Sequence, residues 1–155
     1  MPNIQELACK MNTEVINGLK KSASAVPADK QTWSPLDQGR TVVNQIAECA
    51  LITSFVASTI SGQAMPEFDG AAYEAGMAGL NTLDAAIAAL DTSAAELNAA
   101  ISEFPTDELD TKITMPWFEE PQSFTDIFFI AYWNNTYHIG QINYIQTLYG
   151  DKEMH

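Results

Sequence analysis

The stretch LDAAIAALDTSAAELNAAI, residues 83–101, decides the fold class of this chain. Its large apolar residues recur at alternating spacings of four and three, the period of an α-helix that turns one apolar stripe toward a core. Asn81 or Thr82 before it is typical of a helix N-cap, and Pro105 after it ends the helix. We therefore predict a helix over residues 82–103 in a helical bundle. The stripe comprises Leu83, Ile87, Leu90, Ala94, Leu97 and Ile101.

Three further helices of similar length are expected. Apolar residues at helical spacing fall in residues 3–25, 40–61 and 123–149, and Gly150 is typical of the end of the last helix. At 1.5 Å per residue, helices of this length are about 30 Å or more long and can pack side by side. The pattern predicts an all-α four-helix bundle.

Two connecting segments are harder to interpret. Residues 63–80 contain an Ala-rich run with helical potential, but three glycines weaken it. Between the last two helices, Pro116 and Pro121 exclude a continuous helix. Any β structure should therefore be short and confined to about 106–120.

Length and charge limit the class of protein. The chain has 155 residues, 46% of them hydrophobic, which fits a single globular domain over residues 1–155. Seven basic residues against twenty acidic ones give a net charge of −13. Because phosphate backbones and anionic lipid surfaces are bound through lysine and arginine, this balance argues against both nucleic acid and membrane as partners.

Targeting signals and cysteine usage favour a cytoplasmic location. The first residues lack the basic head and apolar run of a signal peptide, and the strongly apolar run Ile127–Trp133 is far shorter than the roughly 20 residues that span a bilayer. Two cysteines, Cys9 and Cys49, do not form a disulfide framework, so reduced thiols are expected.

Candidate chemistry lies on the last helix. Asn134, His138 and Gln141 follow one another at spacings of four and three, which places them on one face between apolar turns. Glu48 shares the apolar face of the second helix, and a buried carboxylate needs a partner, for which His138 is the candidate. The whole inward stripe is Ile127, Ala131, Asn134, His138, Gln141, Ile145 and Leu148.

Two interpretations of this cluster remain open. It can be a hydrogen-bonded network that fixes the register of the bundle, or it can be a ligand site. One histidine, one glutamate and one asparagine form a poor ligand set for zinc or nickel, because these metals favour imidazole and thiolate. Glycine-rich phosphate loops, paired cysteines and a serine nucleophile elbow are absent from the sequence.

A second apolar stripe runs along the last helix. Ile130, Trp133 and Tyr137 lie beside the inward stripe, and one bundle core need not cover both. We expect this stripe to form a homodimer interface. The alternative is burial by the first helix within the monomer.

Two sequence blocks resemble the DinB/YfiT-like superfamily. Trp33-Ser34-Pro35 followed by residues 39–48, GRTVVNQIAE, resembles its tryptophan-containing loop and second helix; residues 134–142, NNTYHIGQI, resemble its H-x-x-x-H-x-G-Q helix. The resemblance covers nearly the whole chain. It implies an up-down-down-up four-helix bundle with a long crossover, often dimeric, commonly holding a divalent metal with three histidines. Relatives include thiol-dependent transferases and an isomerase.

The family's metal ligands fall on Glu48, Asn134 and His138 in this sequence, and only His138 keeps the family's residue type. The resemblance thus implies a degenerate site with no metal, or with a weakly bound zinc or nickel. Our first hypothesis is a small-molecule binding or regulatory module, with Gln141 in its pocket. The alternatives are a divalent-metal-dependent thiol S-transferase or hydrolase, and a homodimeric interaction protein without a site. Whether the chain is an enzyme stays open.

Overall fold

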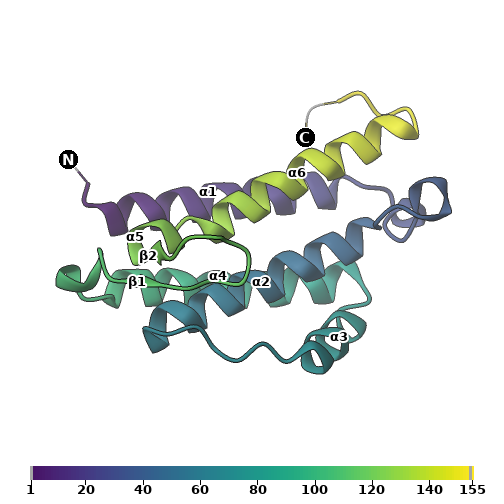
Figure 1. Cartoon of the computed structure of the whole chain (residues 1–155). Coiled ribbons are helices and arrows are strands. Elements are labelled where there is room, and N and C mark those ends of the chain that lie inside the picture. The colour runs from purple at the N-terminus through teal and green to yellow at the C-terminus, as the bar shows by residue number, and fades with distance from the viewer. Residues whose placement is uncertain (1, 154) are drawn as a thin grey trace.

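Four long helices form a bundle in the computed structural model, which describes residues 2–153 and 155 (Figure 1). The first and last of them, α1 and α6, lie side by side; α2 and α4 form the other pair, and α1–α4 and α2–α6 contacts close the bundle. The predicted all-α bundle is confirmed. The bounds are α1 Ile4–Ser24, α2 Val42–Gly62, α4 Leu83–Glu103 and α6 Ile130–Leu148.

The connection between α2 and α4 gives the bundle its topology. Figure 1 shows that α1 and α6 run in one direction and α2 and α4 in the other. Because α2 and α4 are parallel neighbours, the chain must return along the bundle between them. Residues 63–82 make this crossover, and part of it forms the helix α3, Gly70–Gly79, in the segment where the sequence was ambiguous. The order is up-down-down-up, as the resemblance implies.

Side-chain caps fix where the helices begin. Asn3 and Glu6 form a capping box at α1, in which each side chain bonds the backbone N–H of the other residue. Thr41 accepts a hydrogen bond from the backbone of Asn44 at the start of α2. Thr82 caps α4 in the same way, so the chain uses the second of the two caps that the sequence offered.

The last helix differs from the prediction, because it is divided. A short helix α5, Phe124–Ile127, precedes α6, and Phe128 and Phe129 form a turn between them. Nδ2 of Asn12 donates a hydrogen bond to the carbonyl oxygen of Phe128 at 2.9 Å. This bond from α1 satisfies a backbone acceptor at the break, where the regular helical ladder is interrupted.

The β structure lies slightly outside the expected range. Strand β1, Lys112–Ile113, lies within that range and pairs antiparallel with β2, Gln122–Ser123, which ends three residues beyond the limit of 120. Ser123 ends the strand and caps α5 through Asp126, so the strand reaches as far as the helix start allows. Short 3₁₀ turns, η1 Ala28–Lys30, η2 Pro35–Asp37 and η3 Thr106–Glu108, complete the connections.

The core consists of two apolar clusters separated by a polar layer. One cluster occupies the end of the bundle that holds the C-terminal half of α1 and the N-terminal half of α2, and the other occupies the opposite end. Between them, each long helix contributes a fully buried polar side chain. The layer comprises Asn12 of α1, Thr53 of α2, Ser93 of α4, and Asn135 and His138 of α6.

One helix deserves comparison with membrane segments. Among the described residues, α2 is long and apolar enough to cross a bilayer, with a mean hydropathy of 1.3 over its most apolar window. That window is 61% buried inside the bundle. A central helix of a helical core meets the same criteria, so α2 is accounted for by its packing.

We expect Leu97→Ala to lower the free energy of unfolding by about 2–5 kcal/mol, because the side chain is completely buried and its loss leaves a cavity. Leu36→Ala is the matched control, since Leu36 is 93% exposed and should change stability by less than about 0.5 kcal/mol. Urea denaturation measures both. Equal losses in the two variants would contradict this description of the core.

Candidate functional site

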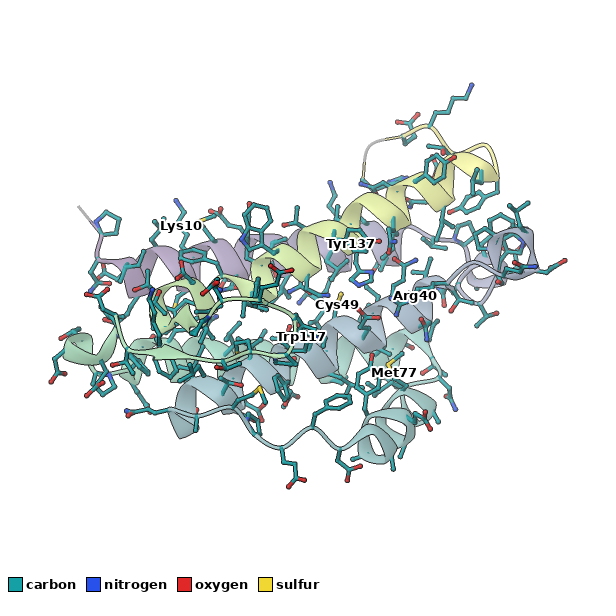
Figure 2. All side chains as sticks on the ribbon, in the orientation of Figure 1. Lys10, Arg40, Cys49, Met77, Trp117 and Tyr137 are labelled. Atoms are coloured by element: carbon teal, nitrogen blue, oxygen red, sulfur yellow. The ribbon has the colours of Figure 1, made fainter. Side chains whose placement is uncertain are left out.

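The candidate site lies where α2 passes α6, at the boundary between the two apolar clusters. His138 projects from α6 into the bundle and has no exposed surface. Glu48 projects from α2, with its side chain 20% exposed. Figure 2 shows Arg40 and Cys49 in this same region between the two helices. The pairing of α2 with α6 therefore brings together residues ninety positions apart in the sequence.

Both nitrogens of the His138 ring face oxygen acceptors. Nε2 lies 3.2 Å from Oε1 of Glu48, and Nδ1 lies 3.1 Å from Oε1 of Gln45. The amide nitrogen of Gln45 points to the carbonyl oxygen of Arg40 at 3.5 Å, which leaves its oxygen toward the ring. A carboxylate can only accept. Nε2 of His138 is therefore the donor in its contact with Glu48.

Arg40 completes the cluster on the other side of Glu48. Its Nη2 contacts Oε2 of the carboxylate, and its Nε donates to Oδ1 of Asn44 at 2.8 Å. The hydrogen bond from His138 is the largest cause that lowers the pKa of Glu48, from 4.5 to about 2; Arg40 adds to it, and burial opposes it. Glu48 is therefore a carboxylate at any physiological pH. We call Arg40, Gln45, Glu48 and His138 the ion cluster.

Two members of the ion cluster were not anticipated as site residues. Gln45 precedes Glu48 by one helical turn, so the helical spacing that selected Glu48 also places Gln45 nearby. Arg40 lies in the loop before the first residue of α2, so helical spacing does not predict the direction of its side chain. Arg40 is, however, the only arginine in the sequence, and it lies close to Glu48, an acid expected on the apolar face. That proximity is the sequence signal that could have identified Arg40 as a site residue.

The other residues expected at the site are placed as follows. Asn134 is half-buried on α6, and its Oδ1 is buried without a hydrogen-bond partner in the described part of the chain. The side chain makes no hydrogen bond to Glu48 or His138. Leu148, predicted to face inward, is instead 48% exposed, and it is the next residue, Tyr149, that packs against the apolar cluster.

A cavity of about 650 Å³ opens beside the ion cluster. The loop before α2 and the C-terminal half of α6 form its walls, and Gln141 contributes a buried Oε1 without a hydrogen-bond partner among the described residues. Arg40 and Gln45 of the ion cluster also line it. The remaining lining residues are Trp33, Pro35, Leu36, Gln38, Gly39, Tyr144, Ile145 and Leu148.

The loop that forms one wall of the cavity has an unusual backbone. Leu36 and Asp37 have φ angles of 55° and 57°, in the left-handed region that non-glycine residues rarely adopt. At Gly39 a Cβ would lie 2.9 Å from the carbonyl oxygen of Pro35, so only glycine fits there without a shift. Strained loops of this kind are common at binding sites, where the surrounding structure holds them in place.

Cys49 offers no reactive thiolate to the site. It is fully buried next to Glu48 in the sequence. Burial is the main cause that raises the pKa of its thiol far above the usual range, and the charge of Glu48 raises it further. Because the thiolate is the form that binds metals and attacks electrophiles, Cys49 behaves as a small apolar core residue.

The sequence profile of the DinB superfamily matches residues 13–142. This chain belongs to the DinB superfamily. Its fold is similar to that of the mycothiol-dependent maleylpyruvate isomerase, with a TM-score of 0.69 and 16% identity, and to that of a histidine-to-alanine mutant of the same enzyme, with a TM-score of 0.69 and 15% identity. In both cases the match covers 92% of this chain and 63% of the other. No curated protein matches the sequence.

In this DinB superfamily member, the positions to which the resemblance assigns a metal, Glu48, Asn134 and His138, do not fit a divalent cation. Both oxygens of Glu48 are already engaged by donors, and the Arg40 guanidinium places a positive charge where a metal would need negative ligands. Nε2 of His138 lies 3.2 Å from Oε1 of Glu48, and the ion pair of this carboxylate with Arg40 disfavours a cation beside it. Within the described residues, no three His, Cys, Asp or Glu side chains gather as a ligand set.

We expect the stability of the protein to depend on pH through Glu48. Since its pKa falls from 4.5 to about 2 on folding, the carboxylate stabilises the fold fully above about pH 4.5 and loses this effect as the pH falls toward 2. The loss in unfolding free energy caused by Glu48→Gln should be about 2 kcal/mol smaller at pH 3 than at pH 7.

Urea denaturation of both proteins at the two pH values measures this change. Glu96→Gln, at an exposed position of α4, controls for the general effect of removing one carboxylate. A destabilisation by Glu48→Gln that is the same at both pH values would contradict the lowered pKa.

Proposed function

We propose that this protein is a small-molecule-binding domain in which the ion cluster replaces the metal of the superfamily and shapes a ligand pocket. The observation that carries the proposal is the direct contact of Arg40 with both Glu48 and the cavity. A guanidinium held by a partly buried carboxylate is a fixed positive group, and the cavity next to it is large enough for a small organic molecule.

The lining of the cavity supports one class of ligand. Its walls are largely apolar and aromatic, with Trp33, Pro35 and Ile145 among them. Its polar side chains are three amides, one tyrosine hydroxyl and one guanidinium, from Gln38, Gln45, Gln141, Tyr144 and Arg40. Such a pocket favours a largely apolar molecule with a single acidic group. The apolar part would displace water from the walls, and the acidic group would accept hydrogen bonds near Arg40.

Arg40 retains hydrogen-bond donors for such a ligand. A guanidinium has five N–H groups. The contacts to Asn44 and Glu48 use Nε and Nη2, and among the described residues none accepts a hydrogen bond from Nη1. Its side chain is 39% exposed, so a ligand can reach these donors from the cavity.

One observation favours the alternative, a divalent-metal-dependent transferase or hydrolase. Oδ1 of Asn134 is buried without a hydrogen-bond partner in the described part of the chain, and such an oxygen can bind a cation. Binding at this position would require Glu48 to leave Arg40. We therefore prefer the metal-free proposal, and a measurement of metal content separates the two.

We expect anilinonaphthalene sulfonate, an apolar aromatic anion, to bind the cavity of the native protein and to gain fluorescence there. Arg40→Gln should weaken binding about 10-fold or more, because a charge-assisted hydrogen bond contributes about 1.5–3 kcal/mol. Lys112→Gln, at an exposed lysine outside the cavity, should leave binding unchanged. Fluorescence titration and calorimetry measure the dissociation constants.

Glu48→Gln distinguishes a ligand contact from general damage to the site. This variant frees the guanidinium of Arg40 from its carboxylate, so binding of the anion should stay the same or become tighter. Equal weakening in the Arg40 and Glu48 variants would show that the ion cluster only maintains the shape of the pocket. Binding unaffected by Arg40→Gln would overturn the proposed ligand class.

Metal content gives an independent test. Protein purified without a histidine tag and dialysed against a mild chelator should contain well under one equivalent of zinc or nickel by mass spectrometry. The physical reason is that Arg40 and His138 already occupy the oxygens of Glu48. Stoichiometric metal that is lost in Glu48→Gln would instead support the metal-dependent enzyme.

A further inference from the structure

A groove of about 570 Å³ lies over the break between α5 and α6. Its walls come from α1, from residues 118–122 and from the first turn of α6. The groove shares no lining residue with the ligand cavity, so the two hollows are separate sites. We call it the α5–α6 groove. Its lining includes Met11, Phe118, Asp126, Phe129, Tyr132 and Trp133.

Aromatic side chains make up much of the α5–α6 groove. Four of its eight lining residues are aromatic, compared with 10% of the whole chain. The rings of Tyr132 and Trp133 have their centroids 6.0 Å apart and their planes at 77°. Two rings in nearly perpendicular planes form a corner, and a group placed in this corner can contact the faces of both. Because the face of an aromatic ring is electrically negative, such a corner attracts cations.

The charge of the groove also favours a cation. Asp126 is the one charged residue in its lining. Oδ2 of Asp126 accepts hydrogen bonds from the hydroxyl and the backbone N–H of Ser123, whereas Oδ1 has no donor among the described residues. Lys10 of α1 pairs with Glu14 on its own helix. Residues 113–151 contain four acidic residues and no lysine or arginine, so the surroundings of the groove attract a positive ligand.

The described part of the chain supplies no cation to the rings of the groove. Its one cation–π contact places Nζ of Lys30 at 5.8 Å from the centre of the Trp33 ring, outside the groove. Trp133 is 70% exposed, so a ligand can reach its ring from solution. The backbone N–H of Phe129 donates to the carbonyl oxygen of Asp126, so this N–H at the helix break is not available to bind an anion. The groove thus combines aromatic rings with a carboxylate and lacks a matching positive group.

We propose that the α5–α6 groove binds a small organic cation that carries a quaternary ammonium group. Such a group has no N–H and needs no hydrogen-bond acceptor, so its methyl groups contact the ring faces and the thioether of Met11 while its charge lies near Asp126. A primary ammonium needs acceptors for three N–H groups and a metal ion needs several oxygen ligands, whereas the free charged oxygen here is Oδ1 of Asp126. The volume lies within the range of about 300–1,000 Å³ that is usual for small-molecule sites.

Two other occupants compete with this proposal. A trimethylated lysine of another protein carries the same group, but a peptide also needs a surface along its backbone, whereas a single hollow accommodates a small molecule. The sequence predicts a second copy of the chain at Ile130, Trp133 and Tyr137, and the first two of these line the groove. A dimer of that kind would close the groove, so binding of the cation and of the second copy would exclude each other.

Calorimetric titration of the full chain with choline tests the ligand class. The neutral analogue 3,3-dimethylbutan-1-ol has the same shape, with a carbon atom in place of the charged nitrogen. Choline should bind with a dissociation constant of about 1 mM or below, and the alcohol should bind at least about 10-fold more weakly, because only the cation is attracted by the ring faces and by Asp126. Equal binding of the two compounds, or no binding of choline, would overturn the proposal.

Substitutions in the groove locate the binding. Trp133→Leu keeps an apolar side chain but removes a ring face, so it should weaken choline binding by about 5-fold or more while the helical circular dichroism spectrum stays unchanged. Asp126→Asn removes the charge and should weaken binding of choline but not of the alcohol. Trp117→Leu is the matched control, because Trp117 is a half-exposed tryptophan that precedes Phe118 and lies outside the groove. Choline affinity that is the same in Trp133→Leu as in the native protein would rule out this site.

The same assay identifies the occupant. The dissociation constant of choline should be equal at about 20 and about 500 micromolar protein, because the groove of the monomer is open. An affinity that falls as the protein concentration rises would show that a second copy fills the groove. A peptide with a trimethylated lysine should bind no more tightly than choline. Binding of this peptide that is about 10-fold tighter and is lost in Trp133→Leu would identify a protein partner and overturn the small-molecule proposal.

Discussion

The imidazole of His138 has two nitrogens and no access to water, so both must find partners inside the protein. That requirement explains the arrangement around it. Gln45 and Glu48 supply the two acceptors from successive turns of α2, and Arg40 neutralises the carboxylate from the segment just before that helix. Removing any one partner would leave a buried polar group or an unpaired charge, which costs more than the contact itself contributes. The relative position of α2 and α6 thus depends on this one ring.

The same ring belongs to the polar layer that divides the core. Apolar clusters are non-directional and tolerate small shifts of one helix along another, whereas buried hydrogen-bonding groups do not. Several atoms of the layer, including Oδ1 of Asn12 and both polar atoms of Asn135, have no partner among the described residues. The layer therefore lowers the stability of the bundle while it restricts the alignment of the four helices. The cavity lies toward one end, next to this fixed section.

The sequence predicted the four long helices well, because their stripes are regular and their ends carry strong signals such as Thr82 and Pro105. The sequence did not predict structural features that depend on contacts with another helix or loop. The break at Phe128 involves an asparagine of α1, more than a hundred residues away, and no local pattern shows it. At the site, helical spacing selected Glu48 and His138, which are in contact, whereas the long side chain of Arg40 reaches them from a loop. Leu148 fits the apolar period but is exposed, while its neighbour Tyr149 packs against the core.

The pairing of α1 with α6 has a consequence for biosynthesis. These are the first and last long helices of the bundle, so the nascent chain can close its core only after α6 has left the ribosome. Until then α1, α2 and α4 share an incomplete core, and Glu48 and Arg40 remain hydrated on the open side of α2. Contacts between segments so distant in sequence also form slowly, since long loops must close first. The contacts of His138 with Gln45 and Glu48 can accordingly form only when α6 docks onto α2.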